Sequence, residues 1–213
     1  MAFSQVLPFP APGNGAAATS SSPPRRRPNA ELRPREHLTP NEVEQLMGMA
    51  RARGRGRCAQ RDAAAILLAY THGLRVSELV ALRWSQFDLG DGVAHITRLK
   101  NGRPSTQPLR GPELRALRQL RRLWPEGQFV LQTESGSPWT AAGFRKMLAR
   151  TGEAAGFAWG VHPHQLRHAT GYRLANQGTD TRTIQAYLGH ANISHTTRYT
   201  ELAADRFANL WKD

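Results

Sequence analysis

The chain has 213 residues, 39% of them hydrophobic, which is enough for one good-sized domain with a buried core. It carries 29 basic against 16 acidic residues, a net charge of +13, and this excess favours a polyanionic partner, nucleic acid above all. The single cysteine, Cys58, excludes a disulfide framework and a cysteine-based zinc site, and no apolar run approaches the length of a membrane span.

The first 36 residues differ in composition from the rest of the chain. They are rich in Pro, Gly, Ala, Ser and Arg and cannot bury enough apolar surface to offset the entropy lost on ordering. We therefore predict a disordered basic arm over residues 1–36, either a DNA-tracking tail or an inert one, and a folded domain over residues 37–213. Because Pro8, Pro10 and Pro12 interrupt its start, a secretory signal is not expected.

The first predicted helix begins at a capping box. Thr39 stands at the N-cap, Pro40 at the first helical position and Glu42 at the third. A glycine-interrupted basic loop is expected over residues 51–57. An almost wholly apolar helix follows at about residues 61–71 and should lie in the core.

A small antiparallel sheet is predicted in the middle of the chain. A short helix after Arg75 is expected to end near Trp84. The next two segments, residues 93–99 and 106–109, have the composition of strands and flank Asn101-Gly102, which is a strong signal for a two-residue hairpin turn.

The rest of the chain is predicted to be largely helical, because its apolar residues recur at helical spacing. A short extended run is expected at residues 129–131. The predicted helices cover residues 112–123, 140–155, 164–177, 181–188 and 202–211. The predicted fold class is therefore mostly α with a small antiparallel β-sheet (α+β).

Two basic side chains in this framework could bind a phosphate or move a proton. Arg75 stands beside core residues at the start of a helix, either as a phosphate ligand or as a structural arginine paired with Glu78. Lys100 ends the first hairpin strand, and lysine, unlike arginine, can give up a proton. It is one of only three lysines among the 29 basic residues, although an ordinary solvated lysine is the alternative.

His164 and Arg167 share the start of a predicted helix and, being three residues apart, lie on one face. The N-terminus of a helix offers N–H groups and positive potential, which favour a phosphate. His168 stands four residues after His164, so a metal site must be weighed. Asp180 is the only carboxylate between positions 160 and 200, which disfavours a metal-dependent nuclease.

Five of the eight histidines fall between positions 162 and 195, a dense set of side chains that can carry protons near neutral pH. His190 follows Gly189 at a predicted helix end, where a simple capping histidine is the alternative to a functional one. Tyr199 lies nine residues further on, in a polar stretch where a core residue is not expected.

Together these elements resemble the tyrosine recombinase (phage integrase) family, from about residue 38 to the end of the chain. Each matching stretch is short, but their joint order and the spacing from histidine to tyrosine are specific. The short recombinases of the fimbrial phase-variation type are the most similar members. The matching stretches are Gly73-Leu74-Arg75-Val76-Ser77-Glu78-Leu79, Arg98-Leu99-Lys100-Asn101-Gly102, His164-Gln165-Leu166-Arg167-His168, Leu188-Gly189-His190 and Arg198-Tyr199-Thr200.

The resemblance implies a site-specific DNA recombinase that inverts, excises or integrates DNA. It would break and rejoin strands through a 3′-phosphotyrosyl link, with no metal, no ATP and no other cofactor. Tyr199 would be the nucleophile, Arg75 and Arg167 would clamp the scissile phosphate, and Lys100 would protonate the departing 5′-oxygen.

The two histidines of the matched stretches also receive roles from the resemblance. His164 would act as base or proton relay toward Tyr199, and His190 would hydrogen-bond the phosphate. The expected partners are double-stranded DNA, a homotetramer on two DNA sites and accessory DNA-bending proteins, with no membrane. The expected location is the bacterial cytoplasm, in association with the nucleoid. Larger members grip DNA with an N-terminal core-binding domain, and here the arm and the basic loop at 51–57 are expected to supply part of the grip.

Two other functions fit the same residues. A non-catalytic DNA-binding regulator could use the same fold, although all six catalytic positions are filled. A strand-nicking enzyme similar to type IB topoisomerases, or a resolvase of DNA ends, would use the same side chains and would relax supercoiled DNA without a defined site.

Overall fold

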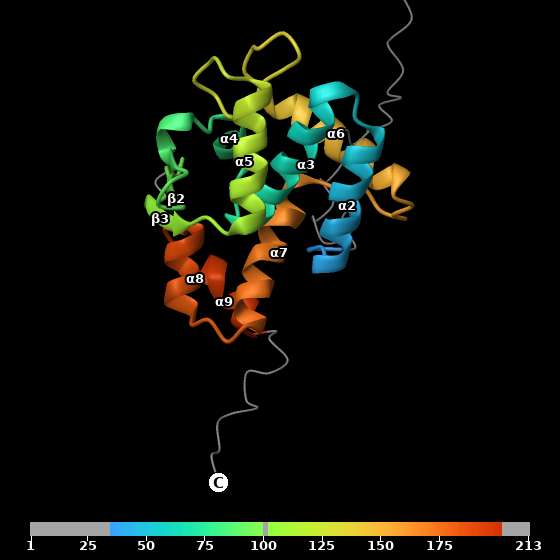
Figure 1. Ribbon diagram of the computed structural model, residues 1–213. Coiled ribbons are helices and arrows are strands. Elements are labelled where there is room, and N and C mark those ends of the chain that lie inside the picture. The colour runs from blue at the N-terminus through green and yellow to red at the C-terminus, as the bar shows by residue number, and fades with distance from the viewer. Residues whose placement is uncertain (1–34, 100–101, 202–213) are drawn as a thin grey trace, which may run out of the picture. The chain divides into compact units, whose positions relative to one another are not determined.

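Helices make up most of the fold in the computed structural model, which describes residues 35–99 and 102–201 (Figure 1). The predicted class, mostly α with a small antiparallel sheet, is confirmed. The short elements are the 3-10 helix η1 (Trp84–Gln86) and the strands β1 (Phe87–Asp88), β2 (Val93–Ile96) and β3 (Ser105–Pro108). The α-helices are α2 (Pro40–Arg53), α3 (Gly56–Thr71), α4 (Val76–Val80), α5 (Gly111–Leu123), α6 (Ala141–Ala154), α7 (Pro163–Asn176), α8 (Thr181–Leu188) and α9 (Ser194–Glu201).

Helix α2 begins at the predicted capping box. The Glu42 amide donates to Thr39 Oγ1 at 3.3 Å, and the Thr39 amide donates to a Glu42 carboxylate oxygen at 2.8 Å. The predicted basic loop over residues 51–57 is wrong, because α2 continues to Arg53 and α3 starts at Gly56. The link can be this short because a Cβ on Gly54 would meet the Ala59 side chain at 2.6 Å, so only glycine permits this approach.

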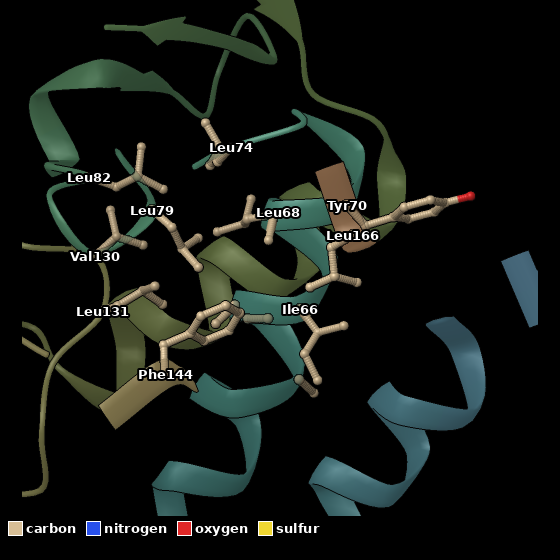
Figure 2. Packing of buried hydrophobic residues seen from close by; sticks show 14 of the residues in the cluster. Ile66, Leu68, Tyr70, Leu74, Leu79, Leu82, Val130, Leu131, Phe144 and Leu166 are labelled. Carbon is tan, nitrogen blue, oxygen red and sulfur yellow. The ribbon is translucent and has the colours of Figure 1, made fainter. Parts of the chain in front are cut away.

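The core is built around α3, which packs against α2, α5 and α7. Its run of alanines lets these neighbours approach closely, and its larger side chains Ile66 and Leu68 are fully buried. Figure 2 shows Leu68 of α3, Leu79 of α4 and Phe144 of α6 in the same cluster. The helix predicted at 61–71 is therefore the central one, and it starts five residues earlier than predicted.

The sheet has the strand order β1-β2-β3, and both pairs are antiparallel. β2 pairs with β3 from Val93 opposite Pro108 to Ile96 opposite Ser105. The strand predicted at 93–99 is too long, because the regular pairing ends at Ile96 and the chain then turns inward to bury Arg98. The strand β1 was not predicted, since two residues carry no periodicity.

Helices α7, α8 and α9 pack together at one end of the described domain, with β3 beside α8 (Figure 1). A second, smaller hydrophobic cluster lies here, and it consists of Tyr172, Ala175, Ile184, Leu188 and Tyr199. The helix α9 was not predicted, because only Thr196 and Tyr199 of its eight residues are buried. The helix predicted at 202–211 lies outside the described residues. Within the described ranges, no helix is long and apolar enough to cross a membrane.

Candidate active site

Arg75 and Glu78 form the first part of the site, at the start of α4. The Arg75 backbone amide and its Nη1 donate to the two oxygens of the Glu78 carboxylate, at 3.0 and 2.8 Å. The Glu78 side chain is only 1% exposed, whereas that of Arg75 keeps 24% of its surface accessible. Arg75 is therefore paired as the structural alternative predicted, and it still presents a face to solvent.

Arg98 is a second cation on the same carboxylate, and no role was predicted for it. Its Nη1 donates to Glu78 at 3.1 Å, and its Nη2 donates to the carbonyls of His72 and Tyr187 at 2.9 and 2.6 Å. Burial alone would raise the pKa of Glu78, but the hydrogen bonds from Arg75 and the charge of Arg98 outweigh it and lower that pKa. Arg98 thus fixes the segment two residues before Lys100 against the element that carries Arg75.

Arg167 reaches the same place from α7. Its side chain is buried, and its guanidinium donates to the carbonyl of Leu188 at 2.8 Å and to the carbonyl of Gly73. Arg98 also donates to the Gly73 carbonyl, at 3.4 Å. Burial, and then the charges of Arg75 and Arg98, lower the pKa of Arg167 to about 9. Three guanidinium groups therefore crowd around one carboxylate and leave excess positive charge for an anion.

His190 follows directly on the end of α8. Gly189 ends that helix in the left-handed region at φ 65°, and a Cβ there would meet Arg98 Cγ at 2.6 Å. The His190 Nδ1 is hydrogen-bonded to Thr196 Oγ1 at 2.8 Å, which fixes the ring. Burial, with added repulsion from Arg167 and Arg75, lowers the pKa of His190 to about 3, so its ring is neutral at neutral pH.

Tyr199 is 1% exposed, contrary to the expectation that it would not be a core residue. Its ring packs edge-on against Tyr172, with centroids 5.1 Å apart, and lies 6.4 Å from the His190 ring. Its hydroxyl oxygen lies 2.9 Å from His168 Nδ1. Burial raises the pKa of Tyr199 to about 12, although the charge of Arg167 opposes the shift.

The remaining predicted residues are His164 and Lys100. His164 is exposed on the first turn of α7, and its ring centroid lies 6.4 Å from that of His168. Lys100 lies outside the described residues. A Cβ on Gly102 would meet the Gly189 carbonyl at 2.9 Å, so Gly102 lies against the turn before His190.

The structure thus gathers Arg75, Arg167, His190 and Tyr199 into one cluster. The charges of Arg75 and Arg167 lower the pKa of His190, and the His190 ring lies next to that of Tyr199. Three further residues join this cluster: Glu78 binds Arg75 and Arg98, and His168 is hydrogen-bonded to Tyr199. The sequence offered one hint of His168, its position four residues after His164 on the same helix face.

Comparison with known proteins shows the family of this chain. The phage integrase family model matches residues 36–206. The chain is 42% identical to the type 1 fimbriae regulatory protein FimE of Escherichia coli K12, over 84% of this chain and 91% of that protein. It is 40% identical to FimB of the same strain, over 85% of this chain and 92% of that protein. The tyrosine recombinase XerD of Ralstonia nicotianae is 34% identical over 90% of this chain and 64% of its own length.

Solved structures show the same fold. XerA recombinase superposes with a TM-score of 0.69 at 24% identity, covering 82% of this chain and 63% of that one. XerH recombinase bound to its difH substrate superposes with a TM-score of 0.67 at 22% identity, covering 84% of this chain and 53% of that one. This chain therefore matches between half and two thirds of the length of these solved recombinases. The chain belongs to the phage integrase family and is a tyrosine-type site-specific recombinase.

Proposed function

We propose that Tyr199 is the nucleophile and that it forms a 3′-phosphotyrosyl link with double-stranded DNA. The observation that carries this proposal is the place of its hydroxyl, 2.9 Å from a neutral histidine, in a cluster whose net charge attracts phosphate. A phenol becomes a useful nucleophile when a neighbouring group takes its proton and cations stabilise the phosphate it attacks.

Arg75 and Arg167 are assigned to the non-bridging oxygens of the scissile phosphate. Both already surround Glu78 together with Arg98, so their positions are fixed before DNA arrives and little reorganisation is needed in the transition state. Neutral His190, held through Nδ1 by Thr196, can donate through Nε2 to a phosphate oxygen.

Lys100 is assigned as the acid for the departing 5′-oxygen, and His164 as a base or relay for Tyr199. The link conserves the energy of the broken phosphodiester bond, so rejoining to a second 5′-hydroxyl needs neither ATP nor a metal ion. A homotetramer on two DNA sites, accessory DNA-bending proteins and a place at the bacterial nucleoid complete the proposal. The similarity to FimE and FimB, type 1 fimbriae regulatory proteins that match 84% and 85% of this chain, supports a recombinase of the fimbrial type.

The test uses supercoiled DNA that carries the gene's own flanking sequence. Wild-type protein should give a denaturant-resistant protein–DNA adduct and an inverted or excised product, and Tyr199→Phe should give neither. Tyr70→Phe is a matched control, because Tyr70 lies in the main core and its hydroxyl is bonded to Arg173. Binding without any adduct from the wild type would favour the regulator, and relaxation of every plasmid would favour the topoisomerase.

A further inference from the structure

We infer that His168 accepts the phenolic proton of Tyr199 when the tyrosine attacks the phosphate. The inference rests on the proposed role of Tyr199 and makes His168, a residue outside the six predicted positions, the direct acceptor of the proton. Of the two roles proposed for His164, base or relay, it leaves the relay, since the His164 ring centroid lies 6.4 Å from that of His168. Its basis is contact: the Tyr199 oxygen lies 2.9 Å from His168 Nδ1, within the range of a strong hydrogen bond. His168 directly follows Arg167, so one turn of α7 positions both the residue proposed to bind the phosphate and the residue that accepts the proton.

The surroundings hold both partners in this geometry. The Tyr172 ring packs edge-on against the Tyr199 ring at 5.1 Å, and Gly171 leaves the space that the Tyr199 ring fills. The two contacting rings, those of His168 and Tyr199, have centroids 5.8 Å apart. Because the base is already held in position, little entropy is lost in aligning it with the phenolic proton when the tyrosine attacks.

Burial and the charges around His168 keep its ring unprotonated before DNA binds. Burial, followed by repulsion from Arg198, lowers its pKa to about 4, while Glu36 opposes the shift and His164 and Arg167 add to it. Glu36 also neutralises Arg198, through a 2.5 Å ion pair. At neutral pH the ring is therefore neutral, and its Nδ1 is an acceptor in the tautomer protonated on Nε2.

Substrate binding should strengthen this base when it is needed. The scissile phosphate brings negative charge against Arg167, so part of the repulsion that lowers the pKa of His168 is cancelled. The same phosphate keeps an imidazolium at His168 stable once it has formed. The pKa of His168 should consequently rise when DNA fills the site.

The proton balance of the step is complete. The Tyr199 oxygen forms a bond to phosphorus, and the phosphorus–5′-oxygen bond breaks. The phenolic proton moves to His168 Nδ1, and the departing 5′-oxygen takes a proton from Lys100 under the proposed function. During rejoining, a 5′-hydroxyl attacks, the tyrosyl oxygen leaves, and His168 returns its proton.

The experiment separates the two proton transfers by changing the leaving group. DNA carrying the gene's own flanking sequence is prepared with either a normal phosphate or a 5′-bridging phosphorothiolate, whose thiolate leaves without protonation. His168→Ala should slow adduct formation at least ~100-fold on both DNAs. Lys100→Ala should be slow on the normal DNA and restored by the phosphorothiolate. His95→Ala is the matched control, because His95 is exposed on β2 and bonded to Thr106.

A purely structural role for His168 is excluded by chemical rescue. Imidazoles of increasing pKa, added to His168→Ala, should restore adduct formation in proportion to their basicity, which a packing defect would not reproduce. The inference would be overturned if His168→Ala formed the adduct as fast as the wild-type protein on both DNAs. A faster variant would overturn it as well, and would make His168 a restraint on the nucleophile. Absence of any adduct from the wild-type protein would instead overturn the proposed function, and this inference with it.

Discussion

Replacing Gly171 by alanine should disable Tyr199 without touching it. Gly171 lies in the middle of α7, and a Cβ built on it would meet three carbons of the Tyr199 ring at 2.6–2.7 Å. Carbon atoms in normal contact are about 3.5 Å apart, so the tyrosine ring must move by about 0.9 Å. The hydrogen bond of 2.9 Å between Tyr199 and His168 would then stretch or bend beyond useful geometry.

The effect on stability should be small compared with the effect on chemistry. Alanine favours the helix by about 0.5–1 kcal/mol over glycine, whereas crowding costs about 1–3 kcal/mol, so the two partly cancel. Displacement of a reacting group by about 1 Å can slow a reaction about 100-fold. Gly171→Ala should therefore melt within a few degrees of wild type and bind DNA normally, yet form the covalent adduct about 100-fold more slowly.

Gly48→Ala is the matched control for this experiment. Gly48 also lies within a helix, α2, but a Cβ there meets no atom within 4 Å. This variant should gain the helix stabilisation and keep the wild-type rate of adduct formation. If Gly171→Ala forms the adduct at the wild-type rate, Tyr199 is not held where the structure places it and the reasoning fails.

Three further predictions concern stability and DNA binding. Glu78→Gln should lower the free energy of unfolding in urea by about 3–5 kcal/mol, because it leaves the buried Arg98 without its carboxylate. A decrease below about 1 kcal/mol would contradict this reasoning. His168 and His190 have pKa values lowered to about 4 and about 3, against about 6.5 when unfolded. Both neutral rings should therefore stabilise the folded state fully above about pH 6.5, and this stabilisation should be lost as the pH falls toward those values. The melting temperature should drop between about pH 7 and about pH 5. An unchanged melting temperature would be inconsistent with neutral buried rings. Deleting residues 1–34, which hold four arginines, should weaken DNA binding and flatten its dependence on salt, and an unchanged slope would show that these residues make no phosphate contact.

The parts of the fold that depend on local signals could be predicted from the sequence. The capping box at Thr39 fixed the start of α2, and the hydrophobic spacing located α5, α7 and α8 within one residue or two. The same reasoning did not predict α9, because a helix that buries only two of its eight residues shows little hydrophobic periodicity in the sequence. It also extended the basic loop too far, since the close approach of Gly54 to Ala59 depends on how the end of α2 meets the start of α3.

The candidate site divides in the same way. Arg75, Arg167, His190 and Tyr199 could be found because their order along the chain carries information, and the structure brings these four together. Arg98 and His168 could not be given roles in this way. The partners that define them are separated from them by 20 and 31 residues, and only the folded chain supplies the contacts.

The ion pair between Glu36 and Arg198 joins positions that are 162 residues apart. On the ribosome, Glu36 emerges early, whereas α9 with Tyr199 emerges among the last elements of the described domain. Arg75 and Arg167, the proposed phosphate ligands, and Arg98, which is paired with Glu78, are therefore all synthesised while Tyr199, the proposed nucleophile, is still missing. If these residues act as proposed, a chain released before α9 would retain the phosphate ligands but lack the nucleophile, and it would compete with intact protein for recombination sites. Under the proposed roles, synthesis of α9 is thus the step that adds a means of cutting DNA to a domain that can already hold it.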